Sequence, residues 1–239
     1  EVSDDVGERS KSHLDFGIFA SLTQYFHKGK QIKASDLEKL IHVSVVSTFD
    51  TPLPKHAEES SSFKELIEER PMSHLDKKLF DCMEDYSYYI GNLANKIEQH
   101  VLQGNEVTTE FVNDVYSQKH LFGNIINDLL AESGKKIDIS RSKPDFVLKS
   151  GKHISMYDLS SGEKQLFYIM LKVLLQEKQE YIFFMDEPEL SLHVDWQEKL
   201  IDKILLLNPN CQLIISTHSP SLLFQGWDSK VINIEDLKH

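Results

Sequence analysis

Two adjacent carboxylates, Asp186 and Glu187, follow the apolar run at residues 181–185. A strand of this kind delivers its carboxyl end to the edge where α/β sheets bind ligands. Adjacent residues of an extended chain point in different directions, so one carboxylate can face a metal ion while the other faces a water molecule. Asp186 suits the oxygen shell of Mg²⁺, and Glu187 suits polarisation of an attacking water. The alternative is a simple polar strand end, although the preceding apolar residues make that a costly place for charge.

A second group spans Ser160-Ser161-Gly162-Glu163-Lys164-Gln165. Ser160 and Glu163 have the spacing of a capping box, which predicts the start of a helix. Gly162 lets the backbone approach another molecule closely, and the free N–H groups at a helix start attract anions. An ordinary capped helix with no ligand explains the same residues, and the pattern alone does not exclude it.

A third group, Ser216-Thr217-His218-Ser219-Pro220, follows another apolar strand. We expect Ser219 to cap a helix and Pro220 to occupy its first position. His218 could then contact a phosphate oxygen at the end of the strand. A structural histidine is the alternative for a single residue of this type.

The elements that must position these groups alternate between strand and helix. Helices are expected at residues 166–176 and 196–207, and strands at 137–139, 146–148, 181–185, 212–216 and 231–234. Alternating strands and helices, with strands apolar on both faces, predict an α/β fold whose parallel sheet is covered by helices.

Residues 58–133 are predicted to be helical throughout. Apolar residues recur every three or four positions, at Leu75, Leu79, Cys82, Tyr86, Tyr89, Leu93, Ile97 and Val101. Gly104 and Asn105 interrupt the pattern, and Thr108 or Thr109 can cap a second helix with its own apolar face. Two antiparallel helices are therefore expected, with the apolar stripe packed between them or, alternatively, used to bind a partner.

The first 57 residues mix a predicted helix with a strand. Leu14, Phe19, Leu22 and Phe26 form a loose helical stripe, and the β-branched run at 42–49 predicts a buried strand that ends before Pro52. We divide the chain into an N-terminal part of the core (1–57), a helical insertion (58–134) and the remainder of the core (135–239).

Composition limits the classes of function. The chain has 239 residues and a formal net charge of −12, which argues against a general nucleic-acid coat protein. No apolar run approaches the roughly 18 residues of a membrane span. Cys82 and Cys211 match no metal-binding spacing and are expected to be free thiols in a reducing cytoplasm. The basic residues between Lys135 and Lys152 are expected to form a solvated hairpin, with a nucleic-acid or effector contact as the alternative.

The three groups together resemble the motifs of ATP-binding-cassette (ABC) ATPases, in the order of that family. Residues 159–165 resemble the signature motif, residues 181–187 the Walker B strand with its catalytic glutamate, and residues 189–197 the D-loop region. His218 matches the switch histidine. The amino-acid sequences of the motifs, together with the helical insertion, are most similar to those of the SMC-like and OLD-like ATPases of bacterial genome maintenance and antiphage defence. Septu-like and retron-associated ATPases are among these relatives.

The resemblance implies a parallel-sheet ABC ATPase core with an antiparallel helical insertion. It also implies two cassettes that form a head-to-tail dimer around two ATP molecules. Asp186 would organise Mg²⁺, Glu187 would activate water and His218 would hold the γ-phosphate. Nucleotide contacts in or near the dimer seam would come from Ser160, Ser161, Gly162, Glu163, Gln165, Ser191 and Asp195. The implied partners are a second copy and a nuclease or toxin effector, with no membrane partner. Nucleic acid stays open as a partner, although the net charge does not support it.

One family motif is missing from these residues. No G-x-x-x-x-G-K-[ST] phosphate loop (Walker A) occurs, and neither Gly134-Lys135-Lys136 nor Gly151-Lys152-His153 completes one. Because the chain begins at Glu1 rather than Met, we expect the loop in an upstream segment. A cytoplasmic ATPase subunit of a defence or repair complex is the favoured function. The alternatives are a non-hydrolysing scaffold that holds an effector, and a transporter cassette.

Overall fold

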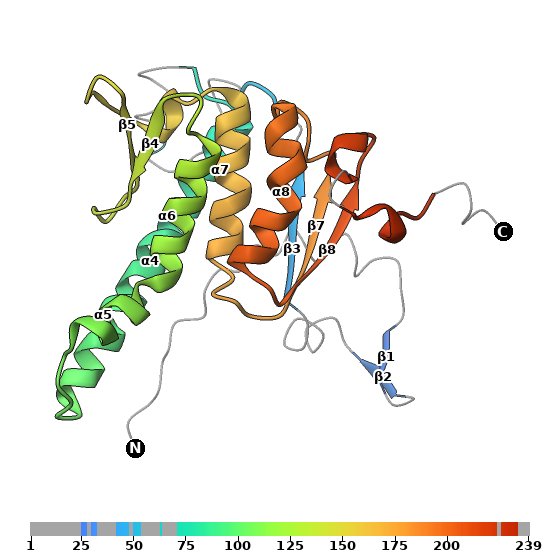
Figure 1. Ribbon diagram of the computed structural model, residues 1–239. Helices are drawn as coiled ribbons and strands as arrows, with labels where there is room; N and C mark the ends of the chain where they lie inside the picture. Colours follow the sequence, from blue (N-terminus) through green and yellow to red (C-terminus); the bar gives the residue numbers. More distant parts are fainter. Residues whose placement is uncertain are drawn as a thin grey trace.

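Three parallel strands form the sheet that carries the predicted site. The computed structural model describes residues 25–27, 30–32, 42–47, 50–53, 63, 71–223 and 226–233. Strands β3 (His42–Ser47), β7 (Tyr181–Asp186) and β8 (Cys211–Ser216) pair in parallel, in the order β3-β7-β8. Figure 1 shows the three strands side by side, with β7 in the middle. The predicted α/β fold with a parallel sheet is confirmed.

The two faces of this sheet differ in burial. Val46, Phe183 and Met185 point to one face and are at most 2% exposed. On the opposite face Ile214 is 43% exposed, and the neighbouring positions of β3 and β7 are only partly buried. Within the described residues, the helices pack on the face that carries Val46, Phe183 and Met185, so the predicted parallel sheet is covered by helices on that face.

Helices α7 (Ser161–Leu174) and α8 (Val194–Leu207) lie together on the buried face (Figure 1). Helix α7 begins at the predicted capping box, and α8 ends just before Asn208-Pro209, where proline stops a helix. Helix α8 connects β7 to its parallel neighbour β8, as a crossover helix must. This arrangement brings the carboxyl ends of β7 and β8 to the same edge.

The region predicted as a helical insertion contains α4 (His74–Leu102), α5 (Thr109–Val115) and α6 (Ser117–Leu129). Thr108 caps α5 as predicted, but the expected second helix is divided into two pieces at Tyr116. The stripe of α4 is buried from Leu75 to Leu93, whereas Val101 near the tip is 52% exposed. The buried part packs against α7 and belongs to one continuous core with the buried residues of α6, so the stripe serves intramolecular packing there.

A small antiparallel sheet follows the insertion. It contains β4 (Lys135–Asp138), β5 (Asp145–Leu148) and β6 (His153–Ile154), and the short 3₁₀-helix η1 (Met156–Asp158) leads from it to α7. Ile137, Phe146 and Ile154 are aligned across the three strands and face the core. Both predicted strands in this region are confirmed.

Three expectations near the chain ends differ from the structure. Phe26, the last residue of the predicted N-terminal helix, lies instead in strand β1 (Tyr25–His27), which pairs with β2 (Lys30–Ile32). The other residues of the predicted helical stripe, Leu14, Phe19 and Leu22, lie outside the described residues. Residues 231–233 form no strand, and the helix after Ser219 is only the 3₁₀-helix η2 (Pro220–Leu223), followed by η3 (Asp228–Lys230). A membrane-crossing helix is absent from the described residues.

Candidate functional site

Glu187 and His218 meet at the carboxyl edge of the parallel sheet. Glu187 follows β7 and His218 follows β8, and the His218 Nε2 lies 3.3 Å from the Glu187 Oε1. The imidazole is 92% exposed and the carboxylate 19% exposed. The structure thus brings two sequence-predicted site residues, 31 positions apart in the chain, into contact on an open edge.

Backbone geometry sets the direction of the Glu187 side chain. Glu187 has a φ of +48°, which is uncommon for a residue with a side chain. Its N–H donates to the Ser216 carbonyl (N···O 2.8 Å), which fixes this turn to the end of β8. Strained backbone of this type is typical of functional positions, where the surrounding structure enforces it.

Asp186 ends β7 and its side chain is exposed at the same edge. A single exposed carboxylate suits Mg²⁺, which usually takes one or two protein carboxylates together with substrate phosphates and waters. No group of three or more His, Cys, Asp or Glu side chains within the described ranges is placed to form an all-protein metal site. The donor set therefore fits a cation shared with a bound nucleotide.

A buried carboxylate lies beneath this edge. Glu189 is 8% exposed, and its Oε1 accepts hydrogen bonds from the backbone N–H groups of His218 (3.0 Å) and Ser219 (3.1 Å). The Thr217 hydroxyl donates to the same oxygen. Gln197 of α8 accepts a hydrogen bond from the Ser219 hydroxyl (2.7 Å). The loop that carries His218 is thus bonded to the segment after β7 and to α8.

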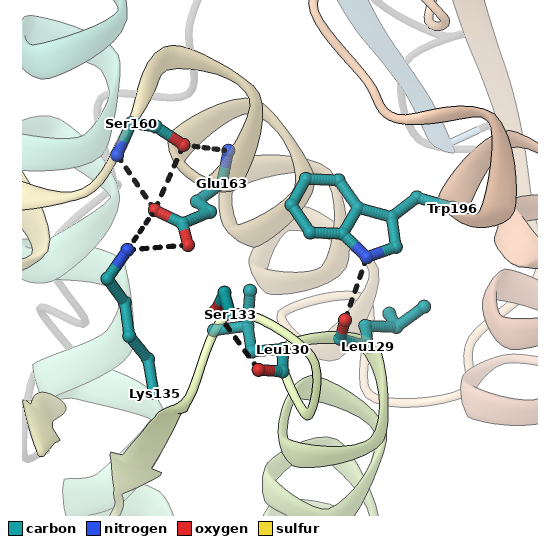
Figure 2. Close-up of polar contacts among 7 residues, drawn as sticks. All are labelled: Leu129, Leu130, Ser133, Lys135, Ser160, Glu163 and Trp196. Atoms are coloured by element: carbon teal, nitrogen blue, oxygen red, sulfur yellow. Dashed lines mark hydrogen bonds and ion pairs between the residues drawn. The ribbon is translucent and has the colours of Figure 1, made fainter. Parts of the chain in front are cut away.

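The start of α7 forms a second polar group (Figure 2). The N–H and hydroxyl of Ser160 donate to the Glu163 Oε2, and the Glu163 N–H donates back to the Ser160 Oγ. The Lys135 Nζ donates to both carboxylate oxygens, at 2.7 and 2.8 Å. Burial raises the pKa of Glu163, but the hydrogen bonds from Lys135 and Ser160 outweigh it and hold that pKa below its ordinary value. Glu163 is therefore a charged structural group inside its own chain.

The surroundings of Gly162 explain why a glycine is needed at this position of the helix start. A Cβ at Gly162 would lie 2.1 Å from the Ser191 carbonyl oxygen and 3.5 Å from the Trp196 ring. The segment that resembles the signature motif and the segment that resembles the D-loop therefore lie in close contact within one chain. Ser191 itself has a φ of +69°. The indole N–H of Trp196 donates a hydrogen bond to the Leu129 carbonyl at 2.7 Å (Figure 2).

Lys164, which follows Glu163 in α7, forms an ion pair with the start of α4. Lys164 forms a 2.7 Å ion pair with Asp76, which is 5% exposed in the first turn of α4. Asp50, which follows β3, accepts a hydrogen bond from the Leu75 N–H (2.9 Å). A continuous polar path therefore runs from the end of β3, through the start of α4, to the start of α7.

The remaining predicted site residues occupy different environments. Ser160, Ser161, Ser191 and Asp195 have exposed side chains, as a contact with a second molecule requires. Gln165 is 3% exposed, and its Nε2 has no hydrogen-bond partner within the described residues. Gln165 and Glu163 are thus turned into the protein.

The predicted basic hairpin is mostly solvated, with one exception. Lys136, Arg141, Lys143, Lys149 and Lys152 are exposed on or beside the antiparallel sheet. Lys135 instead is bound to Glu163. Gly134 and Gly151 lie next to strands and precede no helix, so neither adjoining lysine belongs to a phosphate loop.

Two further features lie away from the sheet edge. An open groove of about 490 Å³ is lined by residues of α4, α5 and the start of α6, and by Glu177. Glu177 precedes the amino end of β7, whereas Glu187 follows its carboxyl end. Cys82 and Cys211 are free, as predicted, and burial raises their pKa values to about 12 and about 11, so both remain protonated thiols at neutral pH.

Sequence reasoning missed the interactions of Glu189, Gln197, Thr217 and Lys135. One signal was available: Glu189 is a third carboxylate in the segment that starts with Asp186 and Glu187, and it stands between Pro188 and Leu190. Its partners could not be identified, because they belong to a loop about 30 residues later in the chain.

The chain is similar to a protein family and to curated bacterial proteins. Residues 5–223 match the family described as "AAA domain, putative AbiEii toxin, Type IV TA system". The sequence is 34% identical over 104 residues to the "Retron Vc95 probable ATPase" of Vibrio cholerae serotype O1 biovar El Tor, which covers 39% of this chain and 20% of that protein. It is 25% identical over 171 residues to the "Retron Ec83 probable ATPase" of Escherichia coli, which covers 66% of this chain and 29% of that protein. The matches span less than a third of each relative.

Solved structures give more distant likenesses. The SMC head domain from Thermotoga maritima aligns with a TM-score of 0.42 and 12% identity, over 84% of this chain and 56% of that one. The Smc head domain derived from Pyrococcus furiosus, bound to the C-terminal domain of ScpA, aligns with a TM-score of 0.40 and 14% identity, over 84% and 63% of the two chains. Likenesses this distant carry no inference about a site or a partner.

Proposed function

This chain belongs to the family described as "AAA domain, putative AbiEii toxin, Type IV TA system", and from that premise we propose that it binds and hydrolyses ATP. The observation that carries the proposal is the contact between Glu187 and His218 at the carboxyl edge of the parallel sheet. A carboxylate and an imidazole on one open edge are suited to a reaction that needs a positioned water and a stabilised phosphoryl group.

Each residue has a distinct part in this proposal. Glu187 accepts a proton from the attacking water, and its backbone bond to Ser216 keeps the carboxylate in place. His218 donates a hydrogen bond to the transferring phosphate, and its exposure leaves it free to turn from Glu187 towards the nucleotide. Asp186 holds Mg²⁺ directly or through water; when bound, that ion neutralises phosphate charge.

The second polar group contributes from a partner copy. Ser160 and Ser161, exposed at the start of α7, would face the nucleotide of a second copy in a head-to-tail dimer, with Gly162 beneath them. Ser191 and Asp195 would lie near the seam. Glu163 would act from inside the chain by holding the start of α7 in shape through Ser160 and Lys135, while Gln165 is buried and would make no direct contact with a partner copy. Free N–H groups at that start suit an anion.

The wider setting is taken from the relatives. Two proteins with similar sequence are named as retron ATPases, and the family description names a toxin–antitoxin system. We therefore place this chain in a cytoplasmic defence complex, where ATP binding and hydrolysis control a separate nuclease or toxin. The 239 residues contain no phosphate loop, so the proposal requires the full-length protein to supply one.

The test is Glu187→Gln in the full-length protein. Removal of the base should lower the rate of ATP hydrolysis by about 100-fold or more while ATP binding persists, so that an ATP-bound dimer accumulates. Phosphate release measures the rate, and light scattering after size-exclusion chromatography measures the dimer. Glu180→Gln is the matched control. Glu180 is also an exposed carboxylate, but it lies just before the amino end of β7, away from the Glu187 end of the strand.

Three other results would change the assignment. Hydrolysis by Glu187→Gln at the parental rate would show that Glu187 is not the base. ATP binding with no hydrolysis by the parental protein would favour the scaffold that holds an effector. Co-purification with a membrane domain would favour a transporter cassette.

A further inference from the structure

The loop that carries His218 is held by Glu189, a buried carboxylate for which the family resemblance implies no role of its own. The Glu189 Oε1 accepts the backbone N–H groups of His218 and Ser219, at 3.0 and 3.1 Å, and the hydroxyl of Thr217. Three consecutive residues therefore converge on one buried oxygen. Hydrogen bonds to a charged acceptor are roughly twice as strong as bonds between neutral groups, so this contact fixes the backbone of the loop.

A second tether acts on the same loop. The Gln197 Oε1 accepts from the Ser219 hydroxyl at 2.7 Å, and its Nε2 donates to the Leu192 carbonyl at 2.9 Å. Gln197 thereby joins the loop to the segment between β7 and α8. Because Glu189 follows Glu187 by only two residues, the His218 loop and the Glu187 turn are held as one unit.

The residue type argues for a specific role. Burial of a carboxylate is unfavourable unless hydrogen bonds compensate it. Glu189 is compensated at Oε1, but its buried Oε2 has no hydrogen-bond partner within the described part of the chain. Packing alone would be served by an apolar side chain. A carboxylate at this position is explained by its ability to gather several N–H and O–H donors on one oxygen.

We propose that Glu189 is a positioning residue for ATP hydrolysis, which acts through His218 by fixing the backbone of residues 217–219 relative to Glu187. This proposal rests on the proposed function. It assigns Glu189 no contact with the nucleotide. We expect Glu189 to affect kcat more than ATP binding, because a small displacement of a group that stabilises the transition state can lower the rate by about 100-fold.

The first measurement does not depend on activity. Hydrogen exchange of the full-length protein is followed in the peptide that spans residues 214–223, for the parent, Glu189→Ala and Glu189→Gln. Loss of the acceptor in Glu189→Ala should accelerate exchange of the loop amides by about tenfold or more. Glu189→Gln keeps one neutral acceptor oxygen and should give an intermediate value. Glu180→Gln should leave the peptide unchanged.

The second measurement is a double-mutant cycle in ATP hydrolysis. Glu189→Ala should lower kcat by about 10- to 100-fold with KM for ATP changed less than about threefold. In a His218→Ala background the same substitution should have almost no further effect, because the group that it positions is gone. If Glu189→Ala does not fold, Thr217→Val removes one donor and leaves the carboxylate in place; a smaller change in the same direction is then expected.

The outcomes separate this proposal from the proposed function. Unchanged exchange in Glu189→Ala overturns it, and so does an equal loss of kcat with and without His218. Faster exchange with no loss of kcat also overturns it, because the contact is then structural only. A parental protein without ATP hydrolysis overturns the proposed function and the catalytic part of this proposal, whereas the exchange result still decides whether Glu189 holds the loop.

Discussion

At the scale of single residues, Gly162 shows that a motif position can be fixed by its own chain. The family resemblance assigns this glycine to a contact with a second molecule. The structure gives an independent reason, since a Cβ would lie 2.1 Å from the Ser191 carbonyl oxygen. Backbone atoms cannot yield as the end of a flexible side chain can, so any larger residue must displace either α7 or the Ser191 segment.

Gly162→Ala should therefore destabilise the isolated monomer by about 1–3 kcal/mol. The control is Gly91→Ala in the middle of α4, where nothing lies within 4 Å of the added Cβ. That substitution should stabilise the protein by about 0.5–1 kcal/mol, because glycine is a poor helix former. Denaturant unfolding of both variants without nucleotide measures the difference. Equal stability of the two variants would contradict the close contact at Ser191.

At the scale of elements, the start of α7 is the point where several structures meet. Glu163 and Lys135 join it to β4, while Lys164 and Asp76 join it to α4. Both ion pairs are largely buried, and removal of one partner of a buried pair leaves an uncompensated charge. The electrostatic state of the α7 start should therefore influence the stability of the fold.

Glu163→Gln tests this through pH. The pKa of Glu163 is lower in the folded protein than its ordinary value of 4.5, so its charge stabilises the fold above pH 4.5. That contribution is lost as the pH falls through the folded-state pKa. Glutamine still fits a capping box, so the variant should lose about 1–3 kcal/mol at pH 7, and the difference from the parent should shrink below about pH 4.5.

Asp81→Asn is the control for this prediction. Asp81 pairs with Lys77 one turn earlier on α4, and its side chain is 57% exposed. Pairs of this kind are worth about 0.5 kcal/mol or less, so its substitution should change the free energy of unfolding little. A difference between Glu163→Gln and the parent that stays constant from pH 7 to pH 3 would contradict the role of charge at Glu163.

At the scale of the whole molecule, the helical insertion and the sheet share one hydrophobic core. Lys203 of α8 also bonds to Asp128 of α6 at 2.7 Å, so the insertion is anchored to the helix that follows the Glu187 segment. The two polar groups remain distinct: Glu187 and His218 meet at the sheet edge, while Ser160 and Ser161 are exposed at the start of α7. In a head-to-tail dimer, one copy would offer each group to the other.

Ser160→Arg should block that association. A long cation at the exposed start of α7 would occupy the space of the partner's nucleotide, so ATP-dependent dimerisation in the Glu187→Gln background should fall by about tenfold or more. The variant also loses an N-cap, which costs about 1 kcal/mol of stability. Thr108→Arg is the control, because Thr108 is an exposed N-cap at the start of α5. Normal dimerisation of Ser160→Arg would contradict the contact in trans.

Local sequence determined the elements and the chemical groups of this protein. The apolar run before Asp186 makes β7, the Ser160–Glu163 spacing begins α7, and Pro209 follows the end of α8, because each signal acts over a few residues. The order of the motifs was enough to indicate an ATPase, and the family match supports that prediction.

Only the tertiary structure decided how those groups are held. Three contacts join positions about 30 residues apart in the chain. They are the hydrogen bonds of Glu189 with residues 217–219, the ion pair of Lys135 with Glu163, and the close approach of Gly162 to Ser191. Local patterns carry no information about such pairs, because the path of the chain between them depends on packing of the whole core. The same reason explains the strand predicted at 231–234: its described residues 231–233 have no neighbouring strand within the described part of the chain and form none.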